Sequence, residues 1–278
     1  MGFTVVVYGA RGSIPACGEN MLDVGGNTSC VLVTINDRVL IFDAGSGIVG
    51  LGQDLLKQDK PITADLFLSH AHYDHLIGLP FFGPLTKPET NLTIWTALPD
   101  APADTENVID AFLRPPFFPV TISEFAAKSH CRTLGVPETL DLGDGVFVRN
   151  CRVNHPGGAY GFRVEYGGRA FCYVSDFEHD GGPMDATLAA FLNGADLAFM
   201  DSTYTPENYD NNRGFGHASW LASGEICEAA KVHSWRLFHH FHLSSDKELG
   251  AIEAAARRRF PNAALAREGD VFDLVRAD

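Results

Sequence analysis

Four side chains that can bind a metal ion lie within six residues, at His70, His72, Asp74 and His75. They directly follow residues 65–68, an apolar run that is typical of a short buried strand. Alternate side chains of an extended chain lie on the same side, so His70, His72 and Asp74 can point to one place, whereas residues two apart on a helix diverge. We therefore interpret this run as part of a metal site and not as a solvated polar turn.

A second set of metal-capable side chains lies far downstream. His155, Asp176 and a late histidine each follow a segment that is predicted as a strand. Together with the first cluster they would supply about seven nitrogen and oxygen ligands and no thiolate, which suits two divalent ions better than one structural zinc ion. The late ligand is His239, His240 or His242, because a shift of one residue exchanges the two faces of a strand.

The composition indicates an ordinary globular protein. The chain has 278 residues, of which 45% are hydrophobic, and this is enough for a sizeable core. No apolar stretch approaches the roughly 20 residues that span a bilayer, and no basic leader precedes the first strand, so we expect a cytoplasmic protein with no membrane partner. The six cysteines form no CxxC pair and are expected to be reduced. The net charge of −14 disfavours long nucleic acids as partners, because their binding depends on Lys and Arg.

Strands and helices alternate along the chain, which favours a layered α/β sandwich in one domain over residues 1–278. Residues 99–137 are rich in proline and phenylalanine. We interpret them as an insert that packs as a flap, in preference to a linker. Strands are predicted at residues 3–8, 30–35, 38–42, 65–68, 91–96, 146–153, 160–166, 170–174, 196–200 and 236–239. Helices are predicted at residues 47–57, 184–193, 218–232 and 246–259, with a further one near Leu76.

These features together resemble the metallo-β-lactamase superfamily over nearly the whole chain. The resemblance implies an α/β fold, a four-layer αβ/βα sandwich of the metallo-β-lactamase type, and two divalent metal ions. We expect Zn²⁺, with Mn²⁺ or Fe²⁺ as alternatives. The residues that carry the resemblance are Asp43-Ala44-Gly45, the HxHxDH run at residues 70–75, His155 before Pro156, Asp176 after Ser175, and the late histidine.

The resemblance also implies a role for each metal-capable residue. Asp43 would orient the histidine loop from behind. In this branch the late ligand follows an apolar pair, and Leu237-Phe238 precedes His239, so His239 is preferred to His240 and then to His242. One ion would be held by His70, His72 and His155, the other by Asp74, His75 and His239, with Asp176 bridging both.

Within the superfamily the chain is most similar to the tRNase Z and PhnP-like phosphodiesterases. Residues 8–15, residues 25–30 and the run Gly216-His217-Ala218-Ser219 carry this likeness. It implies that His217 donates a proton to the leaving oxygen and that Asp201 holds His217. Helix or turn capping is the other interpretation of Asp201. The predicted catalytic residues are therefore Asp74, His217 and Asp201.

The predicted function is a dinuclear metal-dependent hydrolase, a phosphodiesterase that cleaves a small phosphodiester such as a cyclic nucleotide by metal-hydroxide attack. Two metal ions lower the pKa of a shared water toward about 7 and stabilise both reacting oxygens. A leaving alkoxide also needs an acid near neutral pH. The acidic composition and the lack of an evident basic arm favour a small substrate. The insert contains four aromatic residues of interest, Phe112, Phe117, Phe118 and Phe125. They either stack on a base or pack the insert onto the sandwich, and packing is the preferred interpretation.

Two other functions stay open. A thioesterase or lactonase of the glyoxalase II type would use the same metals at a carbonyl carbon and would not need His217. A non-catalytic regulator would bind metal or nucleotide without turnover, although the complete ligand set disfavours it. A redox di-iron centre is disfavoured because His72 stands where those relatives have a glutamate. The resemblance also implies that the chain can form a homodimer.

Overall fold

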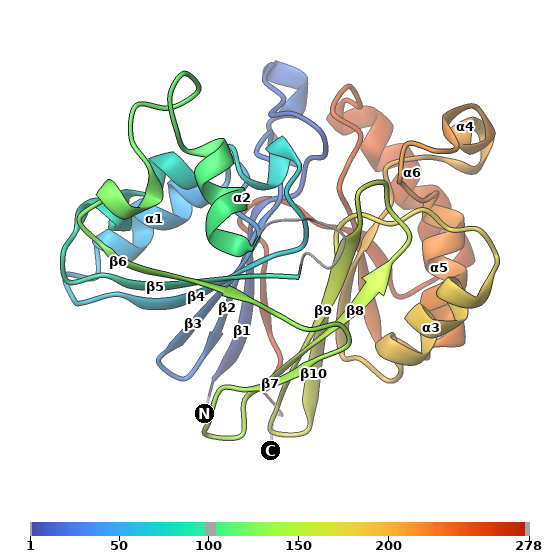
Figure 1. Cartoon of the computed structure of the whole chain (residues 1–278). Coiled ribbons are helices and arrows are strands. Elements are labelled where there is room, and N and C mark those ends of the chain that lie inside the picture. The colour runs from blue at the N-terminus through green and yellow to red at the C-terminus, as the bar shows by residue number, and fades with distance from the viewer. Residues whose placement is uncertain (1, 98–103, 276–278) are drawn as a thin grey trace.

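Two facing β-sheets with helices on both outer sides make up the protein (Figure 1). The computed structural model describes residues 2–97 and 104–275. The layers run helix, sheet, sheet, helix, which is the metallo-β-lactamase arrangement and confirms the predicted fold class.

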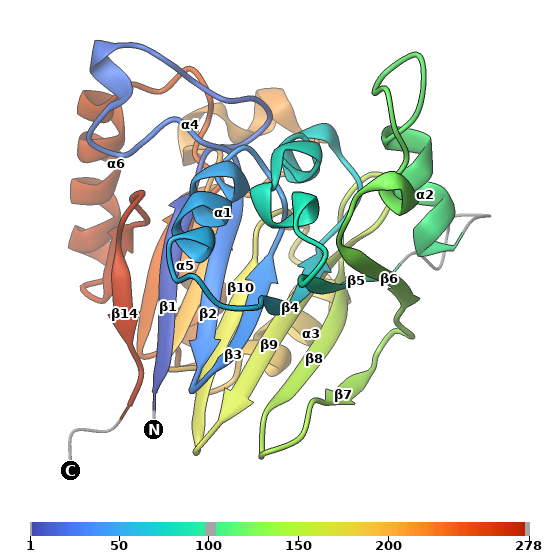
Figure 2. The same ribbon diagram turned by 90° about the vertical axis from the view of Figure 1, so that its left-hand side faces the viewer.

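The first sheet is mixed. Its first strands pair antiparallel, and the turn at Asn36 and Asp37 joins two of them, with Asn36 at the positive φ of 52° that favours such turns. The following strands are added in parallel. Figure 2 shows β14 at one end of this sheet and β6 at the other. In spatial order the strands are β14 (Val271–Asp273), β1 (Phe3–Gly9), β2 (Cys30–Ile35), β3 (Arg38–Phe42), β4 (Thr63–Leu68), β5 (Asn91–Thr96) and β6 (Lys128–Thr133).

The second sheet is also mixed. Its central strands are joined by the predicted two-residue turn at Gly167 and Gly168, where both residues have positive φ. Strands β10 to β13 are parallel. In spatial order the strands are β13 (Ala263–Leu265), β12 (Ser234–Phe238), β11 (Leu197–Asp201), β10 (Arg169–Val174), β9 (Ala159–Tyr166), β8 (Phe147–Val153) and β7 (Thr139–Asp141).

The helices cover the two outer faces, and the two sheets separate three apolar cores, one between the sheets and one under the helices on each side. Helix α1 packs Leu51 against the first sheet, and α6 packs Leu249 against the second. Between the sheets Phe42 of β3 lies against Phe67 and Phe162, with ring centroids 5.4 and 5.6 Å away. The α-helices are α1 (Ile48–Leu56), α2 (Thr105–Phe112), α3 (Pro183–Leu192), α4 (Pro206–Tyr209), α5 (Trp220–Ala229) and α6 (Asp246–Arg259). Short 3₁₀ turns occur at Glu19–Met21, Tyr73–His75, Leu79–Phe81, Gly83–Thr86, Ile122–Glu124 and Asp210–Asn212.

The predicted helix near Leu76 is wrong, because this stretch contains only short 3₁₀ turns. Pro80 and Pro84 lie at the start of two of these turns and lack the N–H that a continuing α-helix needs.

The segment 99–137 has structure of its own in its described part, whereas residues 99–103 lie outside the described residues. Residues 104–137 contain α2, a 3₁₀ turn and β6, which completes the edge of the first sheet. Phe118 and Phe125 stack with their ring centroids 6.4 Å apart. They pack onto the outer core, which lies between the first sheet and the helices that cover it.

Candidate metal centre

Four of the predicted metal ligands come directly after a strand, and His72, Asp74 and His75 lie in the turn that follows His70. Strands β4, β8, β10 and β12 point the same way within their sheets, so their carboxyl ends meet at one edge of the sandwich. His70, His155, Asp176 and His239 each follow one of these ends by one or two residues. Four strand pairings in the second sheet, β8–β9, β9–β10, β10–β11 and β11–β12, therefore bring His155, Asp176 and His239 to one edge.

Three histidines form the first cluster. The ligand atoms of His70, His72 and His155 lie within 4.8 Å of one another. Nε2 of His155 is 3.1 Å from Nδ1 of His72, and the ring of His70 lies 4.4 Å from that of His72. Burial is the largest effect that lowers the pKa of each of these three histidines, so the neutral, ligating form is favoured.

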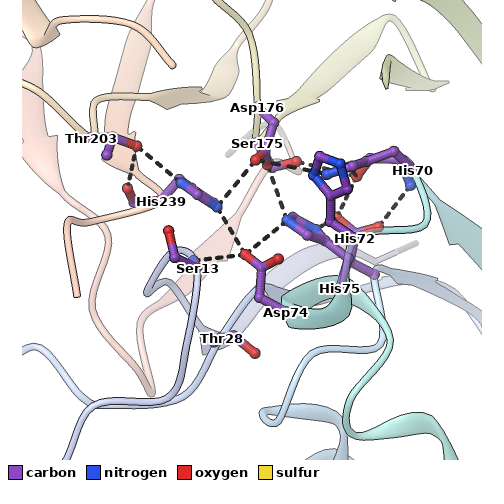
Figure 3. A network of polar contacts seen from close by, with 12 residues as sticks. Ser13, Thr28, His70, His72, Asp74, His75, Ser175, Asp176, Thr203 and His239 are labelled. Carbon is purple, nitrogen blue, oxygen red and sulfur yellow. Dashed lines mark hydrogen bonds and ion pairs between the residues drawn. The ribbon is translucent and has the colours of Figure 1, made fainter. Parts of the chain in front are cut away.

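Asp74, His75 and His239 form the second cluster. Oδ2 of Asp74 lies 3.2 Å from Nε2 of His75 and 3.2 Å from Nε2 of His239 (Figure 3). The backbone N–H of Ser13 also donates to this oxygen, at 2.7 Å.

Asp176 lies between the two clusters. Its Oδ1 is 3.2 Å from Nε2 of His75, and its Oδ2 is 3.2 Å from Nε2 of His239 and 3.9 Å from Nε2 of His70. Asp176 thus contacts members of both clusters, as a bridging carboxylate would.

The residues fit a pair of divalent cations. Nε2 of His70, Nε2 of His75 and Oδ1 of Asp176 are buried and form no hydrogen bond. Buried polar atoms are nearly always satisfied, and here imidazole nitrogens and carboxylate oxygens converge on one place. A His and Asp set of this kind is what zinc and similar cations bind.

Hydrogen bonds behind the clusters orient four histidines. Nδ1 of His75 donates to Asp43 at 2.7 Å, and Nδ1 of His155 donates to the backbone oxygen of Gly216 at 2.8 Å. Nδ1 of His70 lies 3.0 Å from Oγ of Ser69, and Nδ1 of His239 lies 3.0 Å from Oγ1 of Thr203. In each case this leaves Nε2 as the ring nitrogen that faces the site.

Asp43 organises the loop at the end of β4. Its carboxylate accepts hydrogen bonds from the backbone N–H and the hydroxyl of Ser69, from His75, and from the hydroxyl of Tyr173 at 2.7 Å. Tyr173 belongs to the opposite sheet and was not predicted to take part. Only its place in β10, on the face between the sheets, could have indicated it.

The three late histidines have different environments. His239 stands just after β12 with a positive φ of 55°, which turns its ring into the site. Gly12 makes room for it, since a Cβ there would lie 2.3 Å from the ring. Nε2 of His240 instead bonds the backbone oxygen of Ala266 at 2.8 Å, and burial lowers the pKa of His240 to about 3. Among the described residues, His240 and His242 belong to none of the potential metal-binding groups.

His217 and Asp201 form a hydrogen-bonded pair beside the second cluster. Nδ1 of His217 lies 2.9 Å from Oδ2 of the fully buried Asp201. Burial alone would lower the pKa of His217, but Asp201 and then Asp176 and Asp74 raise it to about 9. Asp201 caps neither of the next two helices, since Thr205 stands at the start of α4 and Ser219 at the start of α5. Its Oδ1 does accept from the backbone N–H of Thr203 two residues on, so Asp201 caps this turn as well as holding His217.

A glutamate that was not predicted holds the His217 loop. Both carboxylate oxygens of Glu178 lie 2.9 Å from the backbone nitrogen of Gly214, and one lies 2.8 Å from that of Gly216. Glu178 follows Asp176 by two residues, which is the only sequence feature that could have drawn attention to it.

Residues 38–260 match the family described as the Beta-lactamase superfamily domain, so the chain belongs to this superfamily. It is a hydrolase with the metallo-β-lactamase fold. A similar curated protein is the Ribonuclease Z of Gemmatimonas aurantiaca, which is 25% identical over 301 residues, covering 89% of this chain and 90% of the relative.

Two solved structures share the fold. The metallo-beta-lactamase fold protein YhfI from Bacillus subtilis has a TM-score of 0.73 and 18% identity, with 98% of this chain and 100% of that one covered. A diphosphatase from the PhnP family has a TM-score of 0.68 and 20% identity, with 99% and 98% covered. In the described part of the chain, no helix is both long enough and apolar enough to cross a lipid bilayer.

Proposed function

We propose that this protein is a phosphodiesterase that hydrolyses a small phosphodiester, such as a cyclic nucleotide, with two divalent metal ions. The observation that carries the proposal is the His217 and Asp201 pair beside the metal-ligand candidates. A histidine held by a buried carboxylate is suited to protonate a strongly basic leaving group. A thioester does not need such an acid, because a thiolate leaves readily without a proton, whereas a lactone releases an alkoxide and is separated from a diester only by the assay below.

The metal ions would be held as the sequence predicts, with His70, His72 and His155 around one ion and Asp74, His75 and His239 around the other. Asp176 would contact both. When bound, two such ions supply a nucleophilic water at neutral pH and stabilise the charge of the reacting phosphate. Zn²⁺ is the first choice for this donor set, with Mn²⁺ or Fe²⁺ as alternatives.

His217 would supply the proton to the leaving oxygen. Its Nδ1–H is committed to Asp201, so the proton available for transfer is the one on Nε2. Asp201 is itself fixed, because its Oδ1 accepts from the backbone N–H of Thr203 at 2.9 Å and from the Thr203 hydroxyl at 2.8 Å. The pair stabilises the imidazolium form before the reaction and orients its ring.

The acidic composition supports a small substrate. The net charge of −14 opposes a long polyanion, and the similar PhnP-family protein is named a diphosphatase. The relative in Gemmatimonas is named Ribonuclease Z, so an RNA substrate is the competing candidate and belongs in the test.

The test compares substrate classes on one preparation. Protein reconstituted with Zn²⁺ or with Mn²⁺ is assayed with bis(p-nitrophenyl) phosphate, 2′,3′- and 3′,5′-cyclic AMP, a precursor tRNA, a thioester and a lactone, with His72→Ala as the metal-site control. We expect metal-dependent cleavage of the small diesters, little cleavage of the tRNA and none of the acyl substrates. Cleavage of acyl substrates alone would move the function to carbonyl chemistry, and cleavage of the tRNA alone would make the chain a ribonuclease.

A further inference from the structure

A pocket of about 590 Å³ lies between the HxHxDH run and helix α2. This volume is in the range of about 300–1,000 Å³ that is common for small-molecule sites. Ala71 and Tyr73 of the HxHxDH run form one wall, so the pocket borders the segment of chain that carries His70, His72 and Asp74. The opposite wall consists of Val108, Ala111, Phe112 and Phe117.

The pocket and the candidate metal centre open to solvent at the same stretch of chain. His72 is exposed, and so are its two neighbours Ala71 and Tyr73. His72 therefore stands between two exposed residues that line the pocket. One molecule can place its phosphate at the metal-ligand candidates and another of its groups in the pocket.

The pocket has exposed aromatic rings. Tyr73 is 74% exposed and Phe117 is 77% exposed, whereas Phe118 and Phe125 of the same segment pack onto the outer core. The ring centroid of Phe112 lies 6.1 Å from that of Tyr73. Neighbouring exposed rings at the edge of an active site are characteristic of a surface that a ligand covers.

No residue in the pocket lining carries a charge. The pocket is therefore unsuited to a second phosphate and suited to a neutral group. Flat aromatic rings favour a planar partner, and nucleobases stack on aromatic side chains whatever their sequence.

We propose that this pocket binds the base of a nucleoside phosphodiester whose phosphate lies at the metal-ligand candidates. The inference rests on the proposed function, and it narrows the substrate from any small diester to one that carries a nucleobase. It also assigns Phe117 to base stacking, where the sequence alone favoured packing of the segment.

The test uses diesters with one leaving group and different second groups. Thymidine 5′-(p-nitrophenyl phosphate), methyl p-nitrophenyl phosphate and hexyl p-nitrophenyl phosphate are compared by kcat/KM on the zinc-reconstituted protein. We expect the thymidine ester to exceed the methyl ester by about tenfold or more, as one stacked base allows. Phe117→Ala removes a ring from the pocket and Ala111→Trp fills it. Each variant should reduce the ratio of kcat/KM for the thymidine ester to that for the methyl ester at least about threefold. Phe81→Ala is the matched control, since Phe81 is 62% exposed but does not line the pocket, and it should leave the ratio unchanged.

A titration of the zinc-reconstituted protein with thymidine 5′-monophosphate and with methyl phosphate, followed by calorimetry, tests the pocket without turnover. We expect the nucleotide to bind at least about tenfold more tightly, and less so in the two pocket variants. Equal affinities, equal kcat/KM values or a preference for the hexyl ester would overturn the base-binding pocket even if diesters are cleaved. If no diester is cleaved, the proposed function fails, and the calorimetric comparison still decides the pocket.

Discussion

The Nδ1 atom of His155 lies 2.8 Å from the backbone oxygen of Gly216. The residue just before the candidate acid thus orients a candidate metal ligand from another strand. Gly216 has a φ of +86°, and a Cβ there would lie 2.4 Å from the same nitrogen. The candidate metal site and the candidate proton donor are therefore joined through one glycine.

Gly216→Ala is expected to weaken metal binding by about 10- to 100-fold, the usual cost of disturbing a partner behind a metal ligand. The reason is that the new methyl group displaces the ring of His155. Competition with a chromophoric chelator measures the change. Gly214→Ala is the control, because Gly214 has a φ of +90° but nothing within 4 Å of its Cβ position. An equal loss of metal affinity in both variants would show that backbone strain, and not the contact with His155, is responsible.

Glu178→Ala should lower both metal affinity and turnover, because the N–H groups of Gly214 and Gly216 lose their acceptor. Glu178→Gln keeps one acceptor oxygen, so its metal affinity and turnover should lie between those of Glu178→Ala and those of the original protein. The measurements are chelator competition and kcat for bis(p-nitrophenyl) phosphate. Glu228→Ala serves as the control, since this exposed glutamate pairs only with Arg259 in the described contacts and surface pairs contribute about 0–1 kcal/mol. Equal behaviour of the two alanine variants would refute the positioning role.

His217→Ala is expected to reduce hydrolysis of an alkyl diester, such as 2′,3′-cyclic AMP, by about 10²- to 10⁴-fold. The loss should be much smaller for a p-nitrophenyl ester, because its leaving group departs without a proton. Steady-state kcat/KM for the two substrates gives the comparison. The same loss for both leaving groups would contradict the general-acid role of His217.

His239→Ala should reduce the zinc bound per chain from two ions to one, since its Nε2 atom is 3.2 Å from both Asp74 and Asp176. His240→Ala should leave two ions bound, because Nε2 of His240 bonds Ala266. Metal analysis after removal of free zinc decides between them. Loss of an ion only in the His240 variant would show that His240, and not His239, is the last metal ligand.

The sequence predicted the framework of the site because its signals are local. The HxHxDH run shows its spacing directly, and apolar runs ending in His155 or Asp176 show which strand ends can meet. Helix α6 was predicted with its observed bounds, since Ser245 and Glu248 form a capping box at its start.

The remaining features depend on long-range contacts. His239 enters the site through a positive φ that no residue pattern indicates. Tyr173 reaches Asp43 from the other sheet, 130 residues away in the chain. Glu178 acts through backbone groups, which carry no sequence signal. The exposure of Phe117 was equally hidden, because phenylalanine is predicted to be buried whenever it lies in an apolar segment.

The most direct test of the central claim is a titration of Zn²⁺ into metal-free protein while hydrolysis of bis(p-nitrophenyl) phosphate is followed. The account predicts no turnover without metal and a rate that reaches its plateau at two zinc ions per chain. A plateau at one ion, or no hydrolysis at any ratio of zinc to protein, would contradict it.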